Sequence, residues 1–497
     1  MDALLAGFAD SLTLATLGFV SLGVLIGYVV GVLPGLSRPT ALAMAVPLTF
    51  YMSPLAGIAF LIGISKASGA GGAITAILMN VPGEPNAAAT CLDGYPLARQ
   101  GKAHKALMIS LYGSVIGDIF GTIVLIIVAA PFAKIALAIG PVELSAILLF
   151  ALTFIAGLSG PSLLKGLIAG AIGLFLATVG LDAETATPRL TFDFLELSDG
   201  VSIMAITIGI LGLSEMILQI EDRFLGRESQ VVLTEATDRG DRGLTWADFK
   251  GCLRTIIRSC CIGTGIGLLP GLGATVASFA AYAAARRAST DPDSFGKGNL
   301  EGVAAAETAD NAHVPASLIP LFALGLPGSV GAAILIGGFM VHGIAPGPLM
   351  FQRHARLIYG IYAAMLITSL VILVVGRIGL EGFALLARVP TTIINPIIIF
   401  LCIAGSYMEG SGMFGVYLML GIAIFGYVLR KLDFSFVTLL IGFLVGPMFE
   451  LSVRQSIIIS HGNPLMLLDH PTALTFLALT ALATWHLGRR EVAPTTG

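Results

Sequence analysis

Four Pro-Gly breaks interrupt apolar stretches of the sequence, at Pro34–Gly35, Pro82–Gly83, Pro270–Gly271 and Pro327–Gly328. Pro lacks a backbone donor and breaks a helix, and Gly permits the turn that follows. Unwound backbone inside a membrane is tolerated only where it lines a protein cavity. Freed amides can hold an anion and freed carbonyls a cation. The set predicts one central site for an anionic solute with a coupling cation, although each break alone fits a kink or a surface loop equally well.

Polar side chains around these breaks are candidates for binding the solute or the ion. Ionisable groups inside a membrane are functional hypotheses by default, whereas single hydroxyls and amides more often hydrogen bond between packed helices. The candidate set comprises Pro34, Gly35, Leu36, Ser37, Arg38, Lys66, Asn80, Pro82, Gly83, Glu84, Asn86, Thr90, Pro270, Gly271, Gly273, Thr275, Ser278, Glu307, Asp310, Asn311, Pro327, Gly328 and Ser329. Asp118, a lone acid in an apolar run, fits either a proton relay or a paired structural acid.

Sequence motifs of familiar enzymes are missing. The chain has no HExxH, GxSxG or GxxxxGK[ST] segment. Its seven histidines are dispersed without metal-ligand spacing, and its five cysteines contain no CxxC. We therefore expect no enzyme activity, cofactor or resident metal, with energy supplied by a Na⁺ or H⁺ gradient or by a partner. An intramembrane enzyme acting on lipid or peptide is the remote alternative.

The composition predicts a membrane protein. Of 497 residues, 56% are hydrophobic and only 11% are charged, whereas soluble domains carry about 25% charged residues. Such a chain cannot build the surface of a cytosolic enzyme or a secreted disulfide scaffold. Its net charge of −3 gives no basic field for nucleic acid. We predict an all-α, polytopic membrane protein embedded in a lipid bilayer, whose first apolar segment is a retained membrane helix.

Charge-free stretches long enough to cross a bilayer recur along the chain. Residues 11–37, 144–164 and 410–429 are examples, and with the shorter apolar pieces they predict about 10–12 transmembrane helices plus broken or re-entrant ones. Residues 221–250 instead carry dense charges of both signs, which predicts a polar linker. The expected organisation is a first repeat (1–220), this linker, a second repeat (251–460) and a C-terminal helix and tail (461–497), all in one integrated membrane domain.

The two predicted halves share ordered motifs. GVLPGL at 31–36 recurs as GLLPGL at 267–272, so Pro270 follows Pro34 by 236 residues. ILMNVPGEP at 77–85 parallels FALGLPGSV at 322–330, so Pro327 follows Pro82 by 245 residues. Paired breaks in an internal repeat are typical of secondary transporters. We expect two pseudo-symmetric repeats, in an inverted arrangement that the evenly placed basic residues neither favour nor oppose.

Five long segments resemble a known family: GVLPGLSRPTALAMAVPLTF, GGAITAILMNVPGEPNAAATCLDGYPLARQGKA, GLLPGLGATVASFAAY, DSFGKGNLEGVAAAETADNA and ALGLPGSVGAAILIGGFMVHGIAPGPLMF. They are similar to the large membrane subunit of the tripartite tricarboxylate transporters, the TctA family, in order over residues 17–460. The family's glycine-proline loops fall on 31–36, 81–84, 267–273 and 325–329.

The resemblance implies a permease subunit in the bacterial inner membrane. Such a subunit imports a tricarboxylate or related carboxylate by symport with Na⁺ or H⁺, holding it between the paired loops at mid-membrane. It works with a small four-helix membrane subunit and a periplasmic solute-binding protein, and it could form homo-oligomers. An autonomous carboxylate carrier or channel that needs no binding protein is the alternative.

Departures from the family pattern concern the solute. Ser37 replaces the last Gly of the first loop and is followed by Arg38, Ala70 stands where an aromatic residue is common, and Asp310 replaces an Asn. Arg38 and Lys66 are the best candidates for holding carboxylates, because charge-assisted pairs are strong in a water-poor site. The alternative is that both side chains snorkel to a membrane face. These changes argue against assuming citrate itself.

Overall fold

The computed structural model describes residues 2–33, 36–158, 162–182, 184–225, 243–386, 391–408, 412–461 and 463–492. Within these ranges the regular structure is almost entirely helical. The described strands form one short antiparallel pair, β1 (Gly180–Leu181) and β2 (Pro188–Arg189), with Gly180 opposite Arg189. The predicted all-α class is confirmed.

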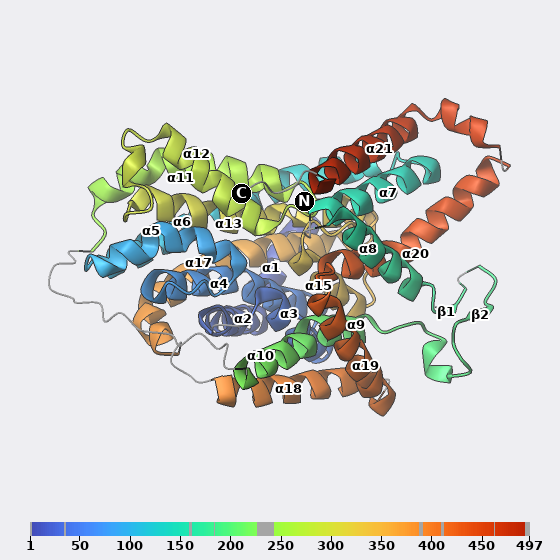
Figure 1. Cartoon of the computed structure of the whole chain (residues 1–497), viewed down its shortest axis with the longest axis horizontal. Helices are drawn as coiled ribbons and strands as arrows, with labels where there is room; N and C mark the ends of the chain where they lie inside the picture. The colour runs from blue at the N-terminus through green and yellow to red at the C-terminus, as the bar shows by residue number, and fades with distance from the viewer. Residues whose placement is uncertain are drawn as a thin grey trace. The chain divides into compact units, whose positions relative to one another are not determined.

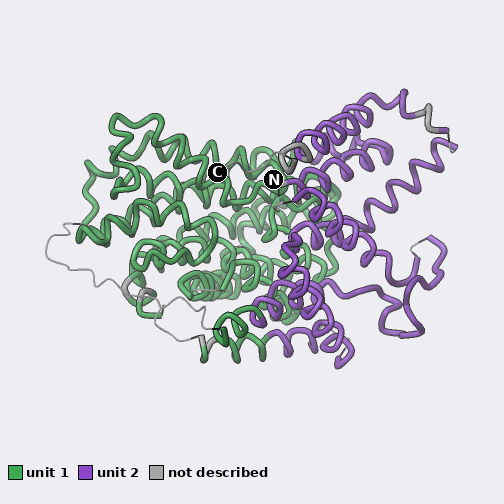
Figure 2. The backbone as a smooth tube through the Cα atoms, viewed as in Figure 1, with its two compact units in different colours: residues 1–131, 218–401 green, residues 132–217, 402–497 purple. Residues whose placement is uncertain are grey.

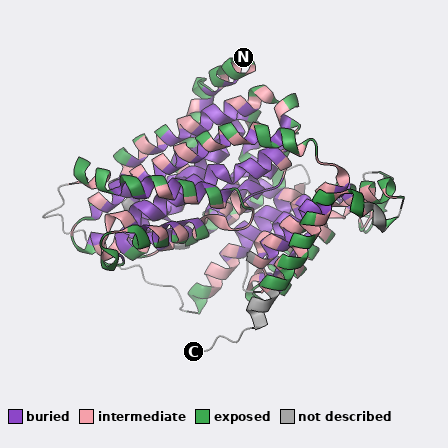
Figure 3. Ribbon diagram, turned by 90° about the horizontal axis from the view of Figure 1, so that it is seen from above, coloured by how far each residue is buried: buried purple, intermediate pink, exposed green. Residues whose placement is uncertain are grey.

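Seven described helical segments are long and apolar enough to cross a membrane, which confirms the polytopic architecture. They are Leu14–Val32, Pro54–Met79, Ala103–Ala136, Ile203–Phe224, Ala355–Leu380, Gly412–Lys431 and Phe436–Ile459. Shorter apolar helices cover Pro141–Gly157, Leu163–Ala177, Val330–Val341, Asn395–Met408 and Pro471–Leu487. In the ribbon coloured by burial, buried residues gather where helices face one another and exposed ones line the outside (Figure 3).

The chain divides into two compact units (Figure 2). Unit 1 contains residues 1–131 and 218–401, and unit 2 contains residues 132–217 and 402–497. Each unit thus draws on both sides of the predicted linker. The predicted boundaries at 220 and 250 remain a prediction, and residues 226–242 of that linker lie outside the described residues.

Unit 1 contains the Gly-Pro motifs and the helices around them, most of which are labelled in Figure 1. Its elements are α1 (Asp2–Ser11), α2 (Leu14–Val32), α3 (Arg38–Ala45), η1 (Val46–Tyr51), α4 (Pro54–Met79), η2 (Pro85–Ala87), α5 (Ala88–Arg99), α11 (Trp246–Gly267), α12 (Gly273–Ala288), η5 (Pro292–Ser294), α13 (Leu300–Ala316), α14 (Leu318–Leu324), α15 (Val330–Val341), α16 (Met350–Arg353) and α17 (Ala355–Leu386). The sequence boundaries of the two units fall within three helices: α6 (Ala103–Ala136), α10 (Ser214–Phe224) and α18 (Thr391–Met408).

Glycines let the backbones of α2 and α4 pack in direct contact. A Cβ atom at Gly27 would lie closer than 3.0 Å to the carbonyl oxygen of Ile64, and one at Gly31 would lie as close to that of Ser68. Small residues at helix interfaces permit this approach in membranes. The end of α2, where the first motif begins, is therefore held directly against the middle of α4.

The same arrangement joins α11 and α13. Cβ atoms at Gly263 and Gly267 would lie closer than 3.0 Å to the carbonyl oxygens of Ala309 and His313, respectively. The α6 helix also packs on α13, since a Cβ at Gly117 would lie closer than 3.0 Å to the carbonyl oxygen of Thr308. These close contacts position the helix that carries the acidic candidates of the second half.

Unit 2 pairs short apolar helices with long ones. Its elements are α7 (Pro141–Leu158), α8 (Leu163–Ala177), β1, β2, η3 (Leu195–Leu197), α9 (Ile203–Thr207), η4 (Ile208–Leu213), α19 (Gly412–Lys431), α20 (Phe436–Ile459), η6 (Pro464–Asp469) and α21 (Pro471–Val492). Arg454 of α20 binds Asp182 at 2.7 Å, which ties the β1–β2 connection to this helix. The Thr185 amide and the Arg454 guanidinium hold the pKa of Asp182 well below its usual range.

Candidate functional site

The first two Gly-Pro motifs contact each other. The α2 helix ends at Val32, α4 ends at Met79, and Asn80 follows in the left-handed conformation (φ 58°). A Cβ at Gly83 would overlap the carbonyl oxygen of Gly31, so the second turn packs tightly on the end of α2. Pro34 and Gly35 lie outside the described residues. The two helices thus end two and three residues before the breaks predicted at Pro34–Gly35 and Pro82–Gly83, and the second turn contacts the helix that leads into the first.

The third and fourth motifs form a second pair. The α11 helix ends at Gly267 and α14 ends at Leu324, after which Gly325 is left-handed (φ 75°), as Asn80 is in the first half. The Gly271 amide, itself at φ 89°, donates to the Gly328 carbonyl at 3.3 Å. Glycine is required at such angles because a Cβ is strained there. Ser329 then caps α15 by accepting from the Ala332 amide.

A buried ion-pair cluster joins these loops to α13. The Arg38 guanidinium, at the start of α3, binds Glu84 at 3.0 Å and Asp310 of α13 at 3.4 Å. Ser68 of α4 donates to the other Glu84 oxygen at 2.6 Å. We call Arg38, Glu84, Asp310 and Ser68 the Arg38 cluster. A Cβ at Gly69 would lie closer than 3.0 Å to Arg38 and Asp310, so the cluster needs glycine there.

The Arg38 cluster joins residues that lie far apart in the sequence. Arg38 and Asp310 pair although 272 residues separate them. One guanidinium faces two carboxylates, so the cluster formally retains one negative charge. In this structure the positive charge of Arg38 is already engaged by protein acids.

Lys66 belongs to a separate buried pair. Its ammonium binds Asp118 of α6 at 3.0 Å and donates to the Met365 carbonyl of α17 at 2.7 Å. Ser369 donates to the same Asp118 oxygen at 2.6 Å. Lys66 is 1% exposed and Arg38 is 8% exposed, so neither side chain reaches the surface as the snorkelling alternative requires. Asp118 has a basic partner, as the structural-acid alternative expects.

Glu307 of α13 is buried among hydroxyl groups. Thr90 of α5 donates to its Oε1 at 2.5 Å, and Ser114 of α6 donates to its Oε2 at 3.1 Å. The Asn311 side chain donates to the Glu307 carbonyl on the same helix at 3.0 Å. The predicted candidates Thr90 and Glu307, 217 residues apart, are thus brought together through α5 and α13.

The other predicted residues have varied surroundings. The buried ones are Leu36, Gly83, Asn86, Ser278, Pro327 and Gly328, and Ser278 donates to the Ala274 carbonyl. Those that are half-buried are Pro270, Gly271, Gly273, Thr275 and Ser329, whereas Asn80 and Pro82 are exposed. Ser37 caps α3. Within the described part of the chain, the structure brings together Arg38, Glu84 and Asp310, and separately Thr90 and Glu307. It places Lys66 with Asp118 instead.

Asp93 is a buried acid that the candidate set missed. Its Oδ1 accepts the amides of Gly296, Gly298 and Asn299 at 2.8–2.9 Å, and its Oδ2 accepts the Tyr282 hydroxyl at 2.8 Å. The carboxylate therefore fastens the 292–299 turn to α5. Its sequence context, DGYPLA, lies inside α5, with Pro96 within the helix. No spacing signal marks such a long-range contact.

Replacing Asp93 by Ala is expected to release the 292–299 turn. Hydrogen bonds to a charged group contribute about 1.5–3 kcal/mol each, and all four are lost together. Lys297, exposed in this turn, should then be cleaved by trypsin at least tenfold faster in detergent-solubilised protein. The matched control is Asp291→Ala, which alters an exposed acid of the same segment and should leave the cleavage rate unchanged. Equal cleavage in both variants would contradict the anchoring role.

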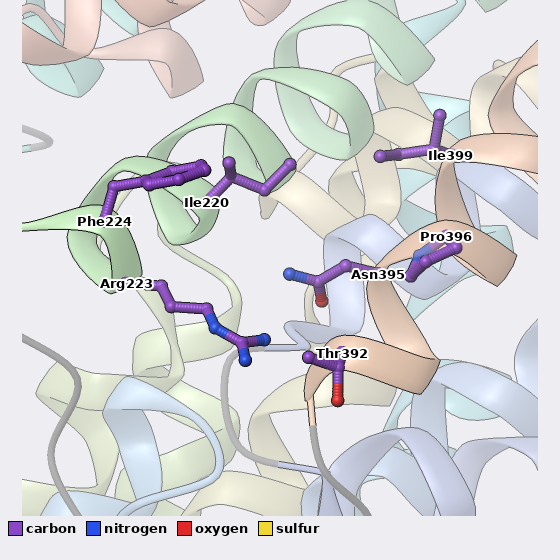
Figure 4. Close-up of a pocket in the computed structure, with 7 residues that line it drawn as sticks. All are labelled: Ile220, Arg223, Phe224, Thr392, Asn395, Pro396 and Ile399. Carbon is purple, nitrogen blue, oxygen red and sulfur yellow. The ribbon is translucent and has the colours of Figure 1, made fainter.

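One described cavity lies apart from the predicted residues. It has a volume of about 470 Å³ and is lined by Ile220, Arg223, Phe224, Thr392, Asn395, Pro396 and Ile399. Figure 4 shows the polar ends of Arg223 and Asn395 directed into the space between α10 and α18. It contains none of the Gly-Pro residues or buried charges, so it is not the centre described above.

Comparisons with known proteins agree with the geometry. The Tripartite tricarboxylate transporter TctA family profile matches residues 17–441. An Agrobacterium vitis protein, described as an uncharacterized 52.8 kDa protein in the TAR-I ttuC' 3' region, is 35% identical over 473 residues, which is 95% of this chain and 93% of the relative. A second protein of that organism, in the TAR-II ttuC' 3' region, is 35% identical over 217 residues, 44% of this chain and 90% of the relative. No solved structure matches.

Proposed function

This chain belongs to the Tripartite tricarboxylate transporter TctA family, and from that premise we propose that it forms the path by which a carboxylate solute crosses the membrane. The observation that carries this proposal is the pairing of the four Gly-Pro motifs in unit 1. Gly83 packs on Gly31, and the Gly271 amide bonds to the Gly328 carbonyl. Broken helices of this kind present free amides and carbonyls to a bound solute or ion.

We further propose that the two halves are structural repeats. Gly263 and Gly267 of α11 follow Gly27 and Gly31 of α2 by 236 residues, which is also the spacing of the first pair of motifs. The carbonyls that they contact, at Ala309 and His313, follow those at Ile64 and Ser68 by 245 residues, which is the spacing of the second pair of motifs. Elements from the two halves also pack crosswise, α15 on α3 and α12 on α5. These correspondences support a two-fold arrangement in which alternating access moves one part against another.

The proposed transporter uses further subunits and an ion gradient. The family is tripartite, so we propose that a small membrane subunit and a periplasmic solute-binding protein act with this chain in the bacterial inner membrane. The proposed solute is a tricarboxylate or related carboxylate, imported with Na⁺ or H⁺. A catalytic role is the less favoured function, since the family to which the chain belongs is a family of transporter subunits.

Uptake into proteoliposomes tests the proposed function. Vesicles would contain this chain with its small membrane subunit, and labelled citrate or a panel of di-, tri- and aromatic carboxylates would be offered under imposed Na⁺ or H⁺ gradients. Uptake that requires both the binding protein and one gradient is the expected result. Equal uptake without the binding protein would favour the autonomous carrier, and absence of any gradient-dependent flux would contradict the proposal.

A further inference from the structure

Glu307 differs from the other buried acids of the described chain. Glu84 and Asp310 bind Arg38, Asp118 binds Lys66, Asp182 binds Arg454, and Asp93 accepts three backbone amides. Glu307 is only 2% exposed, and its carboxyl accepts hydrogen bonds from the hydroxyl groups of Thr90 and Ser114. Among the residues that the structure describes, no basic side chain lies within ion-pair distance of it. Among the buried acids of the described chain, it is the one whose carboxyl has neither a basic side chain nor a backbone amide as its partner.

The hydroxyl partners suit both protonation forms of this carboxyl. A charged carboxylate accepts from Thr90 and Ser114, as the structure has it. A protonated carboxyl can instead donate to one of these oxygens, because a hydroxyl is both donor and acceptor. The proton can therefore be gained and lost without moving the helices. A buried charge without a basic partner is costly, which favours the protonated form whenever the site is closed to water.

The surroundings oppose a permanent negative charge at Glu307. The buried or half-buried titratable groups on the helices packed against α13 are Lys66 (α4), Cys91, Asp93 and Tyr95 (α5), Lys105, Tyr112 and Asp118 (α6), Asp248, Cys252, Arg258 and Cys260 (α11) and Tyr282 (α12), with Glu301, Asp310 and His313 on α13 itself. Lys66 is engaged by Asp118, and Asp93 by Tyr282. Asp310 lies one turn along α13 from Glu307, and like charges at this spacing on a helix repel each other.

Glu307 is also linked to the Gly-Pro loops. Its partner Thr90 lies in α5, the helix that follows the Pro82–Gly83 turn. Its neighbour Asp310 binds Arg38, which in turn binds Glu84 of that turn. A change of charge at Glu307 therefore affects the Pro82–Gly83 turn by two routes, through Thr90 of α5 and through Asp310, Arg38 and Glu84.

We propose that Glu307 is the carrier of the coupling proton, with Thr90 and Ser114 as positioning residues. The inference rests on the proposed transport function and specifies its ion. One proton from the outer solution binds the Glu307 carboxylate, crosses with the carboxylate solute and is released to the inner solution, which leaves the carboxylate for the next cycle. No covalent bond of the solute changes.

Glu307→Gln tests this assignment because it imitates the protonated form. In proteoliposomes with the small membrane subunit and the binding protein, both accumulation driven by a gradient and exchange of internal for external labelled solute without a gradient would be measured. Accumulation driven by a pH gradient should fall at least tenfold, and the pH dependence of exchange should flatten. Glu301→Gln, an acid at the start of the same helix, is the matched control and should keep gradient-driven accumulation.

Glu307→Asp distinguishes a loss of proton coupling from a folding defect. It keeps a carboxyl and should retain accumulation driven by a pH gradient, at a reduced rate, even if the Gln variant cannot be purified. Wild-type accumulation that follows a Na⁺ gradient and ignores a pH gradient would overturn the proton assignment. Accumulation by the Gln variant at the wild-type level would overturn it as well. Loss of exchange in the wild type itself would instead contradict the transport function.

Discussion

Replacing Arg38 by Gln is expected to lower solute uptake per reconstituted molecule more than tenfold. The change leaves Glu84 and Asp310 facing each other in a buried cluster without their common cation. Removing one partner of a buried ion pair costs about 3–5 kcal/mol, a large part of the usual 5–15 kcal/mol of net stability. Uptake in proteoliposomes and thermal unfolding in detergent measure the two consequences.

Two further variants separate stability from solute binding. Arg38→Gln combined with Asp310→Asn removes one of the two carboxylates that would otherwise repel each other. The Ser68 hydroxyl still donates a hydrogen bond to Glu84, so the unfolding temperature should largely recover. If uptake stays absent in that stable double variant, Arg38 also serves the solute, as the sequence predicts. Arg356→Gln is the control, because its pair with Asp10 is exposed and such pairs contribute little. An unaltered unfolding temperature in Arg38→Gln would contradict the role of the cluster.

Gly263→Ala is expected to destabilise the protein, whereas Gly265→Ala two residues later in α11 is not. The new methyl at residue 263 would overlap the backbone of Ala309 and push α11 from α13, while a methyl at residue 265 meets nothing within 4 Å. Overpacking of this kind costs about 1–3 kcal/mol. The control substitution gains helix propensity, which is worth up to about 1 kcal/mol.

Thermal unfolding of both variants in the same detergent measures this contrast. The Gly263→Ala protein should unfold several degrees below wild type and should also lose uptake, because α13 carries Glu307 and Asp310. Similar unfolding temperatures for the two variants would show that α11 and α13 are not in backbone contact. That result would also remove one of the correspondences on which the proposed repeat depends.

The composition and the local order of residues were enough to predict the membrane class of this protein and where several of its helices end. A chain with 11% charged residues cannot coat a soluble surface, and the described structure contains seven helices able to span a membrane. Helices end at Val32, Met79, Gly267 and Leu324 because the Pro-Gly segments that follow restrict the backbone itself. These properties depend on neighbouring residues, so no knowledge of the packing was needed to predict them.

The tertiary structure alone decided which charges meet. Arg38 and Lys66 looked equivalent as candidate ligands for carboxylates, yet one binds Glu84 and Asp310 and the other binds Asp118. Which charged residues pair, at separations of up to 272 residues, depends on which helices pack together. The charge of a side chain does not predict that packing. For the same reason Glu307, one acid among several in the sequence, is distinguished only by the hydroxyl groups that α5 and α6 place around it.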